Sequence, residues 1–317
     1  MTTLDKPMAQ GGHAQPSSAD TQSIWALRWR RFRGHRTGVA SLVVLALLVV
    51  FCLMAGPLEA WRGIDATQTD LFKRYLPISA EHWLGTDDAG RDVLARLMYG
   101  GQVSLLVGLL ATIIGGVFGV SLGLLAGYYG GRLDNALMRL TDGMIALPLL
   151  PLLIVLGAVD LTKLGFSTEA AHSQSVAFWR IILIIALVDW TAIARIVRAA
   201  TLSVKERDYV SAARGSGANA LYIMARHILP NTITPIIVAF TLTVGRVILF
   251  ESVLSFLGFG IVPPTPSWGN MLNNAQELVT TAPALAIYPG LLIFITVIAV
   301  NFLGDAMQHA FDPRSEK

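Results

Sequence analysis

Long apolar stretches alternate with shorter polar segments along this chain. Six stretches of about 20 residues or more carry few charges, a length that suits a membrane-crossing helix. They cover residues 38–58, 103–128, 137–159, 178–197, 232–257 and 285–303. Lipid offers the backbone no hydrogen-bond partners, so each such stretch must satisfy its own backbone as a helix. The pattern therefore predicts an all-α integral membrane protein with six transmembrane helices.

The composition supports the same class. Of the 317 residues, 54% are hydrophobic and only 14% are charged, and the mean hydropathy is +0.58. Such values are not typical of soluble globular proteins. We expect a transmembrane domain over residues 38–305, a disordered cytoplasmic tail over 1–24, rich in Gly, Ser, Gln and Thr, and a cytoplasmic C-terminal tail over 306–317.

The Lys and Arg residues are distributed unequally between the two sides of the predicted membrane. With a cytoplasmic N-terminus, sixteen of the 24 lie inside and seven outside, and Arg246 lies within a span. The positive-inside rule therefore predicts that both termini and the polar segment 199–231 are cytoplasmic. Residues 25–37 form a basic juxtamembrane segment that suits the anionic headgroups of a lipid bilayer. The net charge of +3 thus requires no nucleic-acid partner.

The polar segment between the fourth and fifth spans predicts two short helices joined by a tight turn. Residues 205–214 have charges on one side and apolar groups on the other, which is typical of an amphipathic helix. Gly215 and Gly217 supply the positive φ that a tight turn requires, and Asn219 can cap a second helix, which we expect Pro230 to end. The small residues at this turn are Ala212, Ala213 and Gly217. They leave a shallow surface against which another protein can pack.

Charged residues inside the predicted spans form a second group of candidates. Each costs roughly 2.5–3.5 kcal/mol at the bilayer centre on insertion scales, so each requires a partner or a function. Asp189 and Glu251 fit two interpretations equally well, a structural contact or a polar translocation path. Asp142 lies near the predicted cytoplasmic surface, where a structural partner is the preferred explanation. Arg246 and Glu251 lie five residues apart on one helix, which is too skewed for an i, i+4 ion pair.

An acidic cluster in the first predicted outer loop superficially suggests a metal site. Its members are His82, Asp87, Asp88 and Asp92. Their spacing matches no recognised metal site. Thr86 and Asp87 fit better as N-caps of a helix over residues 90–99. We therefore predict no metal site.

The proline-rich segment 263–269 predicts a stiff turn on the outer side. Trp268 suits the aromatic belt at a membrane–water interface. Pro264 and Trp268 are therefore candidates for an outer lid or a docking surface. A rigid connector is the alternative explanation.

Other sequence features exclude several functions. The chain lacks the Gly-x4-Gly-Lys-Ser/Thr loop that cradles nucleotide phosphates, so ATP must be hydrolysed elsewhere and no cofactor is expected on this chain. The spacing of Ala213, Gly217 and Ile223 imitates a DNA-binding helix-turn-helix, but the second helix offers only Arg226 and His227 as basic groups. The spans also lack a nucleophile and base pair that would indicate an intramembrane enzyme.

The motifs taken together resemble a known family. Segment 211–217 and the Leu229-Pro230 pair resemble the EAA loop of ABC importer permeases, which docks in a groove of the ATPase subunit. A longer series, in order between about residues 25 and 314, resembles the dipeptide/oligopeptide/nickel permease family and, within it, the C-type subunit. The motifs of this series are HWLGTDDAGRD (82–92), YGG (129–131), MRLTD (138–142), ERDY (206–209), RHILPN (226–231), SFLG (255–258), PPTPSWG (263–269) and DPR (312–314).

The resemblance implies a non-catalytic permease subunit of an ATP-driven importer in the bacterial cytoplasmic (inner) membrane. A homologous B-type permease would share the path for peptides or similar small solutes, two ABC ATPase subunits would use ATP and Mg inside, and an external substrate-binding protein would deliver the solute. The implied ATPase-coupling residues are Ala212, Ala213, Gly217, Leu229 and Pro230. Pro264 and Trp268 become candidates for contact with the binding protein.

The resemblance also implies a mechanism of alternating access, in which the ATPase moves the bundle through the coupling loop. It leads us to expect neutral residues at positions 189 and 246, where the chain has Asp189 and Arg246. The alternative is a secondary transporter or channel driven by an ion gradient, with Asp189 and Glu251 as proton or cation sites. That alternative requires transport without an ATPase. Dipeptides, oligopeptides, nickel chelates and glutathione-like compounds all remain open as the substrate.

Overall fold

The computed structural model describes residues 24–273, 277 and 280–311. Residues 1–23 of the tail predicted over 1–24, and the DPR motif at 312–314, lie outside these residues. Within the described part of the chain, helices account for almost all regular structure, and the only β contact is an isolated bridge between Thr86 and Asp92. The prediction of an all-α membrane protein is confirmed.

Five helical segments of the described chain are long and apolar enough to cross a membrane. They are α2 (Arg36–Leu53) with α3 (Ala55–Arg62), α4 (Val93–Tyr129), α8 (Gln174–Lys205), α10 (Ala220–Ile223) with α11 (Leu229–Phe256), and α13 (Ala284–Phe311). A bent pair, α5 (Gly131–Ala146) and α6 (Leu149–Gly157), brings the number to six if it counts as one span. The short helices are α1 (Ile24–Gly34), α7 (Thr168–Ala171) and α9 (Asp208–Gly215), with 3-10 turns at Leu71–Lys73, Leu161–Leu164 and Asn270–Leu272.

The third predicted span, 137–159, is not a straight helix. α5 and α6 meet at an angle of 86°, with Leu147 and Pro148 between them. Leu147 has an extended backbone, φ −76° and ψ 136°. The ring of Pro148 disfavours the helical conformation in the residue before it, so the helix ends there. The apolar pattern located this segment, but it did not predict the bend.

α4 starts earlier than the predicted span 103–128, and its cap differs from the one expected. The Asp92 carboxylate accepts a hydrogen bond from the backbone N–H of Ala95 at 2.9 Å, which caps the helix at Val93. Thr86 is held in its bridge to Asp92. The prediction of Thr86 and Asp87 as the helix caps is therefore wrong.

The most extensive contact between two helices of the bundle is that of α4 with α8. A Cβ atom added at Gly119 would lie 2.6 Å from the carbonyl oxygen of Trp190, and one added at Gly123 would lie 2.6 Å from that of Ala194. Only glycine allows the two backbones to approach this closely. Helices in lipid associate through such van der Waals contact, because lipid provides little hydrophobic drive for association.

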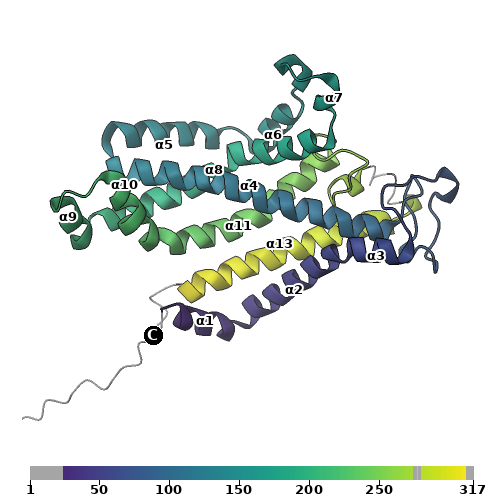
Figure 1. Cartoon of the computed structure of the whole chain (residues 1–317), viewed down its shortest axis with the longest axis horizontal. Coiled ribbons are helices and arrows are strands. Elements are labelled where there is room, and N and C mark those ends of the chain that lie inside the picture. The colour runs from purple at the N-terminus through teal and green to yellow at the C-terminus, as the bar shows by residue number, and fades with distance from the viewer. Residues whose placement is uncertain (1–23, 274–276, 278–279, 312–317) are drawn as a thin grey trace, which may run out of the picture.

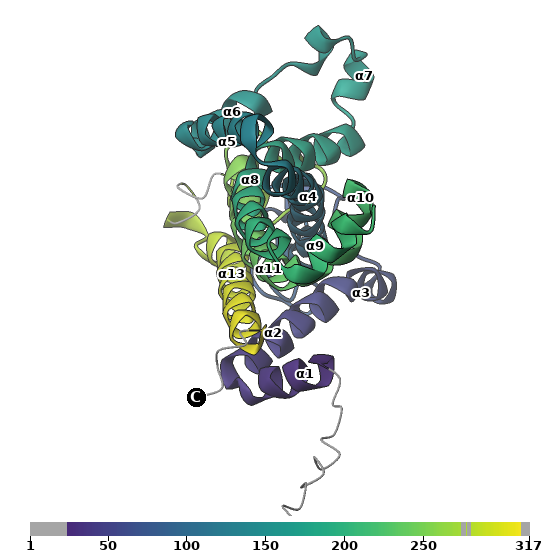
Figure 2. The ribbon, with the colours of Figure 1, turned by 90° about the vertical axis from the view of Figure 1, so that its left-hand side faces the viewer.

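The connections gather at two opposite ends of the bundle. We call residues 208–223, which comprise α9, α10 and the turn between them, the elbow. Figure 1 shows the elbow at one end of the molecule, together with α1 and the last turns of α13, and shows the loop that follows α3 at the other end. Figure 2 looks onto the elbow end, where α9 and α10 lie in front of the bundle.

Candidate functional site

The elbow has the turn geometry that its sequence predicts. Gly217 has φ +83°, and its N–H donates to the carbonyl of Arg214 at 3.0 Å. The side chain of Asn219 accepts a hydrogen bond from the N–H of Tyr222 at 2.8 Å and caps α10. The positive φ predicted for Gly217 and the cap at Asn219 are confirmed. Gly215 instead ends α9 without a positive φ.

The elbow is fixed to the bundle by a small core of its own. Val210 and Ile223 are fully buried and pack with Met224 and Ile228. The partly buried residues around this core include Leu124, Leu125 and Tyr128 of α4 and Val204 of α8. The guanidinium of Arg214 also lies over the Tyr128 ring, 5.7 Å from its centroid. The elbow is therefore packed directly on the end of α4.

The predicted coupling residues divide into an outer and an inner set. Ala212, Gly217 and Pro230 are exposed, and Leu221 and Tyr222 extend this exposed surface. Ala213 and Leu229 are half-buried, and they pack inward against the small core and against the α8–α11 contact. The outer set presents small side chains beside two large apolar ones. This combination is typical of a surface that another protein covers.

The second helix of the elbow does not end at Pro230, contrary to the prediction. α10 continues through a π-helical turn, Met224–Ile228, directly into α11. Pro230 lies in the first turn of α11, where a missing N–H is tolerated. The N–H of Leu229 donates to the carbonyl of Met224, five residues back. α10 and the fifth span are thus one continuous helical segment, Ala220–Phe256.

Asp189 and Arg246 form an ion pair between α8 and α11. Nε of Arg246 lies 3.0 Å from Oδ1 of Asp189, and Nη2 donates to Oδ2 at 3.2 Å. Nη2 also donates to the hydroxyl of Thr243 at 3.3 Å. The Asp189 side chain is 9% exposed, whereas that of Arg246 is 42% exposed. The structural interpretation of Asp189 therefore has a definite partner, which the sequence did not identify.

Glu251 lies in a closed polar cluster. Its side chain is fully buried and accepts hydrogen bonds from the hydroxyls of Ser104 at 2.9 Å and Ser255 at 2.8 Å. The Ser255 hydroxyl in turn accepts from the N–H of Ile261 at 3.0 Å. In this conformation Glu251 joins α4, α11 and the following loop, and it does not line an open path.

Two further ion pairs join α5 to α8. Arg198 donates from Nη2 to Asp134 at 2.6 Å, and Arg195 pairs with Asp142. The partner expected for Asp142 is therefore present. The sequence analysis did not single out Asp134, because its position one turn into a helix gives no sign that an arginine faces it from α8.

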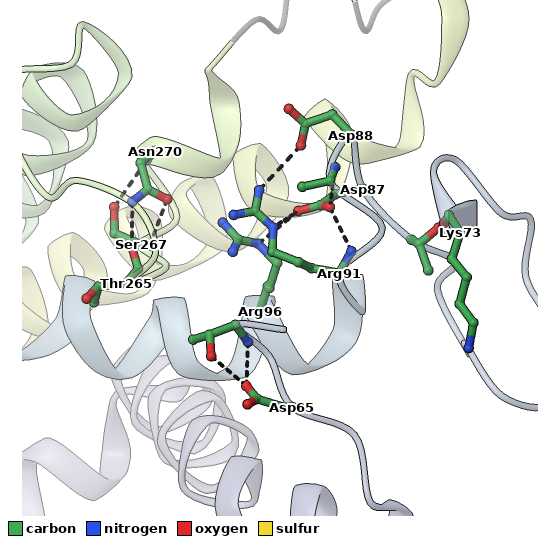
Figure 3. A network of polar contacts seen from close by, with 12 residues as sticks. Asp65, Lys73, Asp87, Asp88, Arg91, Arg96, Thr265, Ser267 and Asn270 are labelled. Atoms are coloured by element: carbon green, nitrogen blue, oxygen red, sulfur yellow. Dashed lines mark hydrogen bonds and ion pairs between the residues drawn. The ribbon is translucent and has the colours of Figure 1, made fainter. Parts of the chain in front are cut away.

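Arginine side chains hold the acidic cluster of the loop that precedes α4. Oδ2 of Asp87 lies 2.8 Å from Nε of Arg91 and 3.2 Å from Nε of Arg96 (Figure 3). His82 and Asp92 form a separate contact of 2.9 Å. Among the described residues, no group of three or more His, Cys, Asp or Glu side chains is arranged to hold a metal ion. These carboxylates position the loop on the start of α4.

Trp268 is not exposed, as a place in an aromatic belt or on a docking surface requires. Its side chain is fully buried, and Nε1 donates to the carbonyl of Leu97 at 2.8 Å. Its backbone N–H donates to the hydroxyl of Ser104 at 3.2 Å. Pro264 is exposed and keeps its place as a candidate for an external contact. Trp268 therefore holds the loop on α4 and does not form part of an exposed docking surface.

Comparison with known proteins identifies the family. The model of the binding-protein-dependent transport system inner membrane component matches residues 119–317. The chain belongs to this permease family. The model of the N-terminal transmembrane domain of oligopeptide transport permease C also matches residues 23–77 of the permease.

Two sequence relatives agree with this assignment. A glutathione transport system permease protein of Pectobacterium atrosepticum is 37% identical to the permease over 290 residues, which cover 92% of this chain and 91% of the relative. A protein of the same name from Escherichia coli O6:K15:H31 is 40% identical over 293 residues, covering 92% and 90%. A crystal structure of an amino acid ABC transporter aligns with a TM-score of 0.49 and 18% identity, over 67% of this chain and 92% of that chain.

Family membership settles the general activity. The chain is a permease subunit of an ABC importer and a multi-pass inner-membrane protein. Subunits of this family are not catalytic, and the ATPase activity lies in separate subunits. The family works in general with a partner permease, ATPase subunits and a substrate-binding protein. This result excludes the alternative of a secondary transporter or channel driven by an ion gradient.

Proposed function

We propose that this permease, paired with a homologous B-type permease, forms the path of an importer for small peptide-like solutes. We further propose that two ABC ATPase subunits, using ATP and Mg, move it through the elbow. Both relatives named above are glutathione permeases, which supports a peptide-like solute delivered by an external binding protein. Both termini and the elbow are then cytoplasmic, as the distribution of Lys and Arg favours.

The observation that carries this proposal is the continuity between the elbow and two spans. α10 runs into α11 without a break, and the core around Val210 and Ile223 rests on α4. A displacement of the exposed surface at Ala212 and Gly217 is therefore transmitted to both helices. When ATP binding brings the ATPase subunits together, the displaced elbow shifts the bundle between its outward-facing and inward-facing states.

Replacing Gly217 with leucine tests the coupling. The position has φ +83° and no atom within 4 Å of an added Cβ, so the side chain fits but the backbone is strained by about 1–2 kcal/mol. We expect Gly217→Leu to insert and assemble normally and to lose the ATPase stimulation caused by solute-loaded binding protein. The measurement is the ATPase rate of the reconstituted complex with and without that protein.

Gly165→Leu is the matched control. Gly165 has φ +93° and equally open surroundings, but it ends the 3-10 turn Leu161–Leu164 three residues before α7. Figure 1 shows α7 well away from α9 and α10. We expect this variant to keep its stimulation. Full stimulation in Gly217→Leu, or an equal loss in both variants, contradicts the role of the elbow.

A further inference from the structure

The Asp189–Arg246 pair lies inside the hydrocarbon core of the membrane. α8 has 32 residues, and a core of about 30 Å takes only about 20 of them. Wherever the core falls along α8, it includes the middle of the helix, and Asp189 lies there. Arg246 is held at the same depth by its two contacts with Asp189, so its guanidinium does not extend to the headgroups.

Arg246 has an exposed side at this depth. Its side chain is 42% exposed in the isolated chain, although its partner is buried. A cation that faces lipid at the bilayer centre is costly, and such residues face a water-filled cavity or the interior of a bundle. The exposed side of Arg246 therefore faces away from lipid, toward the path that this permease shares with its partner.

The ion pair leaves one edge of the guanidinium unused. Asp189 occupies the edge formed by Nε and Nη2. In the described part of the chain, Nη1 makes no hydrogen bond, and no second carboxylate faces the end-on edge formed by Nη1 and Nη2. The one contact on that edge is the long hydrogen bond from Nη2 to the Thr243 hydroxyl at 3.3 Å, which a bound carboxylate must replace. A planar guanidinium can bind a carboxylate through two parallel hydrogen bonds on either edge.

We propose that Arg246 is a solute-binding residue in the translocation path and that its end-on edge binds the carboxylate of a peptide-like solute in transit. Asp189 is the positioning residue, since it fixes the guanidinium plane and neutralises the site when no solute is present. The bound carboxylate shares the arginine with Asp189. This competition keeps binding weak enough for release, as a transport path requires. The inference rests on the proposed function and adds to it the chemical group that the path recognises.

Arginine-specific labelling of the whole transporter tests this inference. The complex of both permeases and both ATPase subunits is treated with the water-soluble reagent hydroxyphenylglyoxal, without nucleotide and with ATP. Modification of each arginine is then read by peptide mass spectrometry. The probes are trialanine, which has a free carboxylate, and trialanine amide, which does not. Arg132 is exposed and outside the path, whereas Arg96 is 3% exposed, so they serve as the reactive and the unreactive control.

We expect Arg246 to be modified in at least one nucleotide state. Trialanine should slow this modification about tenfold when it occupies nine-tenths of the sites, and trialanine amide should leave the rate unchanged. Arg132 should react equally with either probe. The inference is overturned if Arg246 stays unmodified, because lipid or an acidic residue of the partner permease then covers it. It is also overturned if both probes slow the modification equally, or if neither probe slows it. The ATPase stimulation of the same preparation reports the proposed function separately, so a coupled complex without protection at Arg246 retains the function and loses only this inference.

Discussion

At the scale of single residues, Trp268 fixes the proline-rich loop to the first turns of α4. Its indole fills the space beside Gly101, where an added Cβ would lie 2.6 Å from the ring, and its Nε1 donates to Leu97. Its backbone N–H reaches Ser104, which also donates to the buried Glu251. One residue thus joins the proline-rich loop to α4 through its indole and to the polar cluster of α11 through its backbone N–H.

Removing this indole should destabilise the permease strongly. Truncating a buried aromatic side chain costs about 3–5 kcal/mol, so Trp268→Ala should lower the apparent unfolding temperature of the detergent-solubilised protein by several degrees. Trp268→Phe keeps most of the volume and loses the hydrogen bond to Leu97, so its effect should be smaller. Trp61→Ala removes an indole that is 74% exposed and should change little. Equal shifts for Trp268→Ala and Trp61→Ala would contradict the anchoring role.

The sequence predicted the conformation of a residue well where neighbouring residues determine it. It predicted the contacts of a residue poorly where they come from a distant part of the chain. The positive φ of Gly217 and the cap at Asn219 depend on a few neighbouring residues, and both were found. The sequence shows that the charge of Asp189 in a span needs a partner. It does not show that the partner is Arg246, which lies 57 residues away on another helix. Trp268 was misplaced because its burial depends on the glycines of α4, which no local pattern reveals.

At the scale of elements, the bundle depends on the close approach of α4 and α8. Four glycines of α4 recur at every fourth position and face α8, namely Gly115, Gly119, Gly123 and Gly127. The carbonyl oxygens of α8 lie where side chains would otherwise be. Any larger residue on this face must push the two helices apart.

Gly119→Val tests the packing of these two helices. A Cβ at this position would lie 2.6 Å from a backbone oxygen of α8, and backbone atoms cannot move aside cheaply, so overpacking should cost about 1–3 kcal/mol or more. We expect reduced yield of assembled protein and a lower unfolding temperature. Gly290→Val, in a helix position with open surroundings, is the control of equal size. If both variants behave alike, the close contact does not limit stability.

The third span shows what hydrophobicity alone cannot predict at this scale. Its apolar residues identified a helical pair that together is long and apolar enough to enter a membrane. The 86° bend between α5 and α6 arises at the Leu147-Pro148 step, and proline is also tolerated inside spans, as Pro235 in α11 and Pro289 in α13 show. The position of a proline therefore does not decide by itself whether a span breaks.

At the scale of the whole molecule, the chain separates its two proposed partner surfaces. The elbow projects at one end, and the loop held by Asp87, Arg91 and Arg96 closes the other (Figures 1 and 3). The continuous rod of α10 and α11 and the α4–α8 pair run between them. ATPase subunits that act on the elbow can therefore displace the loop at the opposite end without contacting it, if the helices of the bundle move as rigid bodies.

Site-specific photo-crosslinking of the assembled transporter tests this account most directly. A benzoylphenylalanine is placed at Ser216, on the exposed turn of the elbow, and separately at Ile78, which is 68% exposed in the loop at the opposite end. On irradiation, Ser216 should give an adduct with an ATPase subunit and Ile78 should give none. The absence of an ATPase adduct at Ser216, or an ATPase adduct at Ile78 instead, would contradict the role of the elbow as the coupling surface.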